Sequence, residues 1–156
     1  MLFLMKKIIF ICHGNICRSP VGEILFNKLV KEKGLDKKYF AISRATSFEE
    51  INNDIYPPMK KILIEHNIEF NRHHATRITK EDFLLSSYIF YMDYNNYYNL
   101  TRMFGDDKKM KLISIFYNNK EIEDPWYTNR FEYVYNEIYQ CVKNIISYLE
   151  KEEEKN

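Results

Sequence analysis

The sequence predicts an α/β fold: a single domain with a four-stranded parallel sheet, helices on both faces, and a phosphate-binding loop after the first strand. Two observations predict it. Short apolar runs typical of strands alternate with longer stretches of helical periodicity, which favours parallel strands joined by crossover helices. The turn-rich loop after the first apolar run ends at a helix start, where open parallel sheets bind anions.

The first strand and the first helix flank this loop. Residues 6–12 (KKIIFIC) end in a β-branched and aromatic run without polar alternation, as expected of a strand covered on both faces. Ser19 suits the N-cap of the following helix and Pro20 suits its first position. One apolar face continues from there to Gly34, which ends the helix.

The next elements repeat the alternation. Residues 39–43 form a second apolar run, and Pro57 begins a second helix that carries apolar residues on one side. Residues 87–92 and 111–116 predict two further strands, and residues 93–104 predict the helix between them. The four predicted strands form the parallel sheet, and the helices between them connect the strands and cover the sheet.

The last helix has the clearest pattern. Its apolar residues fall on one stripe at a period of 3.6: Phe131, Val134, Tyr135, Ile138, Cys141, Val142, Ile145 and Leu149. The charged tail at residues 151–156 predicts a frayed end. We therefore expect the domain to cover residues 1–150.

Composition excludes several classes of protein. With 156 residues, 46% hydrophobic and 29% charged, the chain resembles neither a disordered nor a membrane protein, and its net charge of +1 argues against nucleic-acid binding. Lys6 and Lys7 interrupt the apolar N-terminus, and no small-residue cleavage site of a signal peptide follows. The cysteines Cys12, Cys17 and Cys141 fit neither a disulfide framework nor a zinc site, so we expect a cytoplasmic, reducing location.

The loop after the first strand carries the predicted chemistry. A loop that closes into a helix N-terminus turns its backbone N–H groups inward as an anion nest, with Gly14 expected to supply the backbone freedom. Arg18 closes the loop and can hold phosphate, while the Cys12 sulfur attacks phosphorus in line. A helix N-terminus and a cation favour the thiolate. The expected phosphate-binding residues are His13, Gly14, Asn15, Ile16, Cys17, Arg18 and Ser19.

A thiolate that displaces a phenolate needs an acid, because a phenol oxygen of pKa about 10 leaves poorly unless it is protonated. Asp124 is the candidate. Pro125 stiffens the chain beside it, and the rings of Trp126 and Tyr127 can wall a flat aromatic substrate. The Asp124 carboxylate can then deprotonate the water that releases the phosphate. This chemistry requires no metal ion and no cofactor.

Two motifs resemble the low-molecular-weight protein tyrosine phosphatases: CHGNICRSP, with Glu23 in the following helix, and the downstream DPWY. The likeness extends over nearly the whole chain. It implies a cysteine-dependent phosphatase that hydrolyses phosphotyrosine. It also implies roles for five residues: Cys12 as nucleophile, Arg18 in phosphate binding, Asn15 in holding the loop, Ser19 in stabilising the thiolate, and Asp124 as general acid.

The resemblance implies a second layer of residues. His73 and Ser43 support the loop from below, and Phe48 lies in the segment that usually forms the third wall of the pocket. A reversible disulfide between Cys12 and Cys17 would protect the nucleophile from overoxidation. The substrate would be a phosphotyrosine-containing protein, and a tyrosine kinase is a possible further partner. The chain is expected to be a monomer or a weak dimer.

Three positions depart from the family pattern. Thr76 stands where many relatives have arginine, residues 48–54 lack the usual glycine, and Thr128 and Asn129 replace a glycine after DPWY. These differences concern the rim of the pocket and so the choice of substrate.

Three other functions fit the loop less well. An arsenate reductase needs further cysteines in a later segment, but none lies between Cys17 and Cys141. A protein arginine phosphatase carries threonine at the position of Ile16. A module that binds phosphotyrosine without turnover would be expected to lose Cys12 or Asp124, and both are present.

Overall fold

The structure is a computed structural model that describes residues 4–155. Residues 1–3 of the apolar N-terminal stretch and residue 156 of the expected tail lie outside the described residues. The elements are, in chain order, β1 (Lys6–Cys12), α1 (Arg18–Glu32), β2 (Tyr39–Ala45), α2 (Pro57–Glu65), α3 (Lys80–Leu85), β3 (Tyr88–Tyr91), α4 (Tyr94–Phe104), β4 (Met110–Leu112), α5 (Pro125–Thr128) and α6 (Phe131–Glu154).

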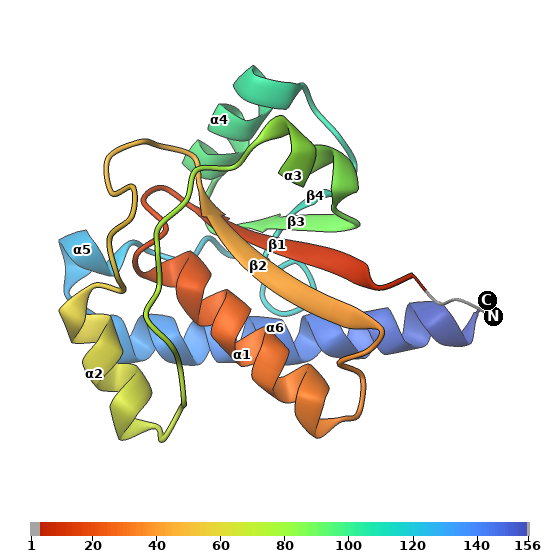
Figure 1. Cartoon of the computed structure of the whole chain (residues 1–156), viewed down its shortest axis with the longest axis horizontal. Coiled ribbons are helices and arrows are strands. Elements are labelled where there is room, and N and C mark those ends of the chain that lie inside the picture. The colour runs from red at the N-terminus through yellow and green to blue at the C-terminus, as the bar shows by residue number, and fades with distance from the viewer. Residues whose placement is uncertain (1–3, 156) are drawn as a thin grey trace.

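The four strands form one parallel sheet in the order β2-β1-β3-β4, as Figure 1 shows. This confirms the predicted fold class. Strand β1 lies inside the sheet and pairs with β2 from Lys6 to Cys12. Its residues 8–11 are completely buried, because helices cover both faces.

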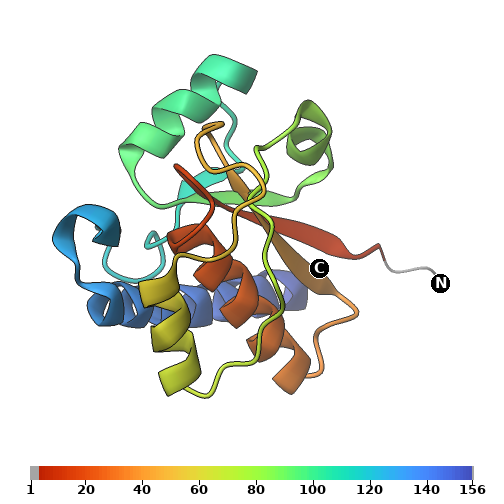
Figure 2. The same cartoon turned by 60° about the vertical axis from the view of Figure 1, so that its left-hand side comes forward.

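The helices divide between the two faces. Helices α1, α2 and α6 cover one face and share a core with Ile8 and Phe10 of β1. Helices α3 and α4 lie on the other face, where Ile9 and Ile11 pack with Leu100 of α4. The turned view in Figure 2 shows the same two layers. Alternate residues of β1 therefore serve two separate cores.

Helix α1 packs closely on β1. A Cβ atom added to Gly22 would lie 2.9 Å from the ring of Phe10, so the helix approaches the strand more closely than a larger residue would allow. This contact fixes the start of α1 relative to the end of β1, and the predicted phosphate-binding loop joins those two ends.

The predicted boundaries differ most at the first helix and at the last strand. Helix α1 begins at Arg18, and Ser19 does not cap it, because its hydroxyl binds Cys12 and Asn15 instead. Strand β4 ends at Leu112, so the predicted strand at residues 111–116 is wrong beyond that point. The chain turns there: the backbone nitrogens of residues 117 and 119 both donate to the Ser114 carbonyl.

The C-terminal helix is longer than predicted. Helix α6 continues to Glu154, across the expected boundary at residue 150, so the predicted frayed end is wrong for residues 151–154. The hydroxyl of Tyr39 donates to Glu153 over 2.6 Å, and that of Tyr88 donates to Glu152 over 2.7 Å. These bonds attach the last turns of α6 to the starts of β2 and β3.

Candidate active site

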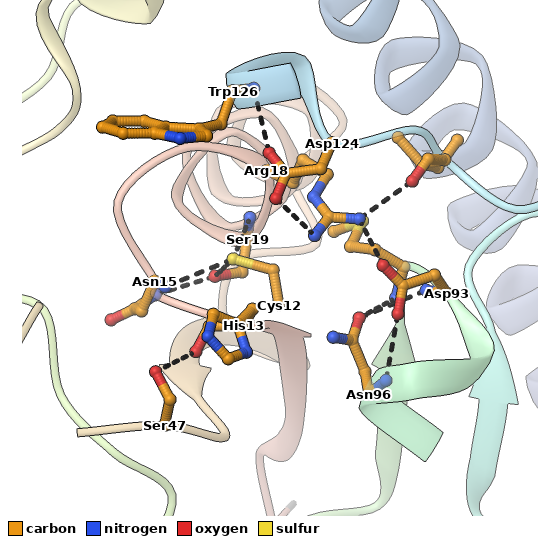
Figure 3. Close-up of polar contacts among 12 residues, drawn as sticks. Cys12, His13, Asn15, Arg18, Ser19, Ser47, Asp93, Asn96, Asp124 and Trp126 are labelled. Carbon is orange, nitrogen blue, oxygen red and sulfur yellow. Dashed lines mark hydrogen bonds and ion pairs between the residues drawn. The ribbon is translucent and has the colours of Figure 1, made fainter. Parts of the chain in front are cut away.

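The nucleophile candidate lies at the end of the central strand. Cys12 is the last residue of β1 and is 3% exposed. Its sulfur lies 3.0 Å from the hydroxyl of Ser19, and the backbone nitrogens of Asn15 and Ser19 point to it from 3.3 and 3.4 Å (Figure 3). Three donors surround this one sulfur: the Ser19 hydroxyl, a backbone group of the loop and a backbone group of the first turn of α1. Together they stabilise negative charge there.

The hydrogen bonds below the loop have a defined direction. The Asn15 side-chain nitrogen donates to the hydroxyls of Ser19 at 2.8 Å and Ser43 at 2.9 Å. Each hydroxyl is thus left with its own proton to give. Ser19 gives it to the Cys12 sulfur, and Ser43 gives it to the Glu23 carboxylate over 2.6 Å. The buried side chain of Asn15 therefore determines that the Ser19 hydroxyl donates to Cys12 and that the Ser43 hydroxyl donates to Glu23.

Asn15 also carries the backbone strain of the loop. Its φ is 61°, in the left-handed region, where asparagine is tolerated better than most residues. Its carbonyl accepts from the His73 ring over 2.6 Å, and its side-chain oxygen accepts from the Thr76 backbone over 2.9 Å.

The predicted role of Gly14 in backbone freedom is wrong, because its φ is not positive. A Cβ atom there would lie 3.2 Å from Glu50, so Gly14 provides space.

Arg18 is held at the other end of the loop. Its side chain is 3% exposed, and Nη1 donates to Asp93 at 2.8 Å and to the Ile122 carbonyl at 2.9 Å. Nη2 lies 3.6 Å from Asp124. Burial alone would lower the pKa of the Arg18 guanidinium, but the anionic groups around it, Cys12 foremost, raise it above its ordinary value. The cation therefore stays charged beside the loop.

Asp124 faces the same guanidinium from a separate segment. It is the N-cap of the short helix α5, and one carboxylate oxygen accepts from the Trp126 backbone over 3.0 Å. The other oxygen faces Arg18, as Figure 3 shows. The Ile122 backbone nitrogen donates to the Met92 carbonyl at the end of β3 over 2.8 Å, which anchors the chain just before Asp124. The predicted nucleophile, arginine and acid thus come together.

These groups open into one cavity of about 180 Å³. Its lining residues are Cys12, His13, Gly14, Ile16, Cys17, Arg18, Glu49, Glu50, Tyr56, Asp124, Trp126, Tyr127 and Phe131. The predicted loop residues Asn15 and Ser19 do not line it, because both are fully buried beneath it. The cavity is therefore lined by the phosphate-binding loop and by aromatic side chains from other segments.

One predicted wall is misplaced. Phe48 does not line the cavity; its side chain is 71% exposed, and the Arg77 guanidinium lies 4.2 Å from its ring centroid. The next residues of the same loop, Glu49 and Glu50, line the cavity instead, together with Tyr56. None of these three residues was predicted from the sequence, because no periodicity or motif marks which residue of an irregular loop turns inward.

The comparison with known protein families decides the assignment. A family model described as "Low molecular weight phosphotyrosine protein phosphatase" matches residues 7–155. The chain belongs to this family. The matched range covers both site segments and the last helix.

Individual relatives agree in sequence and in fold. The human low molecular weight phosphotyrosine protein phosphatase is 38% identical over 154 residues, covering 94% of this chain and 95% of that protein. The crystal structure of YfkJ from Bacillus subtilis superposes with a TM-score of 0.91 at 30% identity, covering 96% of this chain and 97% of that one. The phosphatase from Streptococcus pyogenes gives a TM-score of 0.84 at 34% identity, with 93% of both chains covered.

Two asparagines lie in the left-handed region of backbone conformation, in the two segments that lack an expected glycine. Asn52 has a φ of 72° within residues 48–54, and Asn129 has a φ of 61° after α5. Asparagine visits this region at a lower steric cost than other non-glycine residues. Thr76 contributes its backbone to the support of Asn15. The backbone near the rim therefore does not need glycine at these positions.

The other cysteines have different surroundings. Burial raises the pKa of the Cys17 thiol, with Cys12 adding to the rise, so Cys17 favours the neutral thiol. Cys141 is completely buried in α6, as its place on the apolar stripe predicted. Both Cys12 and Cys17 are free thiols, and the disulfide between them stays a prediction.

Within residues 4–155, no group of three or more His, Cys, Asp or Glu side chains is arranged to hold a metal ion. None of the helices among these residues has the length and apolar character that a membrane span needs.

Proposed function

We propose that the chain hydrolyses phosphotyrosine through a phosphocysteine intermediate, with Cys12 as nucleophile, Arg18 binding phosphate and Asp124 as general acid and base. The observation that carries the proposal is the arrangement around the Cys12 sulfur. Three hydrogen-bond donors converge on it, and the same cavity is lined by a buried guanidinium and a carboxylate from a distant segment. These are the groups that attack, charge stabilisation and leaving-group protonation each require.

In the first step the Cys12 thiolate attacks phosphorus as the bond from phosphorus to the tyrosyl oxygen breaks. Asp124 gives its proton to that oxygen, so tyrosine leaves neutral and the phosphoryl group stays on sulfur. Arg18 neutralises charge on the phosphoryl oxygens through two parallel hydrogen bonds from its guanidinium, while Nη1 keeps its bonds to Asp93 and the Ile122 carbonyl.

In the second step the Asp124 carboxylate takes a proton from water, and the hydroxide attacks phosphorus. The sulfur–phosphorus bond breaks, its electron pair returns to Cys12, and inorganic phosphate leaves. Donors aimed at the sulfur favour this departure, since they stabilise the thiolate that forms. The sum is monoester plus water giving tyrosine plus phosphate, with both residues restored and no metal ion used.

The walls of the cavity support an aryl substrate. Tyr56, Trp126, Tyr127 and Phe131 line it, and aromatic rings pack well against a flat phenol. Relatives are named as a phosphotyrosine protein phosphatase or as a protein-tyrosine-phosphatase. We therefore propose that the substrates are phosphotyrosine-containing proteins in the cytoplasm. A tyrosine kinase is a candidate partner, and the chain acts as a monomer or weak dimer.

The test is hydrolysis of phosphotyrosine, phosphoserine and phosphoarginine by the wild type, Cys12→Ser and Asp124→Ala, with a chelator present. We expect turnover of phosphotyrosine, its loss in Cys12→Ser, and a fall of roughly 10²- to 10⁴-fold in kcat/KM in Asp124→Ala. A preference for phosphoarginine would overturn the substrate and keep the nucleophile. Loss of activity with the chelator, restored by a divalent metal, would overturn the metal-independent mechanism.

A further inference from the structure

Tyr56 is a residue of the cavity wall that belongs to neither sequence motif. It is half-buried at the N-cap of α2, and its backbone nitrogen donates to the Ile16 carbonyl of the phosphate-binding loop over 2.8 Å. Its side chain lines the cavity. The residue therefore contacts the loop through its backbone, which leaves the ring available for other contacts.

The ring joins two segments that lie far away in the sequence. Its centroid is 4.9 Å from that of Trp126, with the planes at 85°, an edge-to-face contact. It is also stacked on Phe131, at 5.8 Å and 30°. Phe131 is the first residue of α6 and is 8% exposed, so it offers the Tyr56 ring a fixed support.

Trp126 is directly coupled to the proposed acid. Its backbone nitrogen donates to one carboxylate oxygen of Asp124 over 3.0 Å. Both residues belong to a short, poorly buried segment: α5 has four residues, Trp126 is 60% exposed and Tyr127 is 83% exposed. A segment with so little burial has a low free energy of local opening, so each side-chain contact that holds it matters.

We propose that Tyr56 is a positioning residue for the general acid: its ring holds Trp126, and through it the Asp124 carboxylate, at the place from which the leaving oxygen is protonated. The inference rests on the proposed function. Tyr56 need not touch the reacting atoms for this role. An error of about 1 Å in the placement of a reacting group can cost on the order of 10²-fold in rate, so loss of a support is measurable.

The dependence on the leaving group separates this role from a merely structural one. Protonation helps a poor leaving group most, and tyrosine, with a pKa of about 10, is a poor one. The phenol of p-nitrophenyl phosphate is far more acidic and leaves with little help. A misplaced acid therefore lowers kcat/KM for phosphotyrosine much more than for p-nitrophenyl phosphate, whereas damage to the loop or to the wall lowers both alike.

The experiment measures kcat/KM for free phosphotyrosine and for p-nitrophenyl phosphate. The proteins compared are the wild type, Tyr56→Ala and Tyr56→Phe. The readout is kcat/KM for phosphotyrosine divided by kcat/KM for p-nitrophenyl phosphate. We expect this ratio to fall about tenfold in Tyr56→Ala and to stay at the wild-type value in Tyr56→Phe, which keeps the ring. The backbone bond to Ile16 survives both changes. Tyr56→Leu, which keeps bulk without an aromatic ring, replaces the alanine variant if that does not fold.

An unchanged ratio in a folded variant without the ring would overturn the inference, whether both constants fall together or neither changes. Such a result would leave the proposed function intact, since the wild type would still hydrolyse phosphotyrosine. A wild type with no activity on phosphotyrosine would instead overturn the proposed function itself.

Discussion

Arg18 and Asp93 form a buried ion pair, with 2.8 Å between Nη1 and the carboxylate oxygen and only 3% of the arginine side chain exposed. Asp93 also caps α4 by accepting from the Asn96 backbone over 3.0 Å. The pair therefore joins the start of α1 on one face of the sheet to the start of α4 on the other. Adjacent strands β1 and β3 bring these two starts together.

Asp93→Asn removes this charge but keeps a side chain that caps a helix equally well. We expect kcat/KM for phosphotyrosine to fall about tenfold, because Arg18 loses an anchor and turns toward Asp124, 3.6 Å away. The free energy of unfolding should fall by roughly 2–4 kcal/mol, since a buried cation loses a partner. Steady-state kinetics and denaturant unfolding measure the two effects.

Thr79→Ala is the control for that variant, because Thr79 caps α3 through the Asp82 backbone. It should lower stability by about 1 kcal/mol and leave kcat/KM unchanged. Wild-type kcat/KM in Asp93→Asn would contradict the role given to the ion pair.

Asn15 combines buried hydrogen bonds with a left-handed backbone, and a pair of variants separates the two. Asn15→Ala should lose roughly 2–4 kcal/mol of unfolding free energy, because partners below the loop are left unsatisfied and alanine is strained at a φ of 61°. Asn15→Gly removes the same bonds without the strain, so it should be more stable than the alanine variant by about 1 kcal/mol. Equal stability of the two would contradict the strained geometry.

The rim carries two acidic residues, Glu49 and Glu50, that face an anionic substrate. We expect Glu49→Gln and Glu50→Gln each to lower KM for p-nitrophenyl phosphate a fewfold at low salt, with the gain shrinking as salt screens the charges. Glu81→Gln in the exposed first turn of α3 is the control and should leave KM unchanged. A salt-independent effect would point to a change of shape.

Asp54 gives the fold a pH dependence. It accepts from the backbones of Ile55 at 2.8 Å and His73 at 2.9 Å and pairs with Lys60. Although burial acts in the opposite direction, the Lys60 ammonium and these backbone donors hold the pKa of the Asp54 carboxyl well below its ordinary value. Because the folded-state pKa is the lower one, its stabilisation is fully present above the unfolded value of about 3.9 and is lost as pH falls through the folded value.

Asp54→Asn should therefore lower the unfolding free energy by roughly 1–3 kcal/mol at pH 7. The stability curves of wild type and variant, measured by denaturant unfolding, should approach each other as the pH falls below about 4. A constant difference down to low pH would show that the charge of Asp54 is not the cause.

The parts of the site that the sequence predicted are local in the chain. The loop from Cys12 to Ser19 follows a strand and opens a helix, so its residues are necessarily close in space. Asp124 was predicted from chemistry and a second motif. Asp93 begins the predicted helix at residues 93–104, and the structure places it both at the N-cap of α4 and beside Arg18.

The parts that the sequence did not predict depend on tertiary contacts or on ambiguous local patterns. Nothing near Tyr56 indicates Trp126, which lies 70 positions further along the chain. Helix α3 was missed although Thr79 and Asp82 form a capping box, because six residues are too few to show helical periodicity. The apolar residues after Leu112 suggested a longer strand, but apolar runs alone do not distinguish a strand from buried turns.

A phosphoryl group on Cys12 can be detected by mass spectrometry of the enzyme quenched in acid during turnover of p-nitrophenyl phosphate. The phosphocysteine mechanism predicts one phosphoryl group, located on the peptide that contains Cys12, and none on Cys12→Ser. Turnover by the wild type without a phosphorylated Cys12 at any quench time, together with activity in Cys12→Ser, would contradict it.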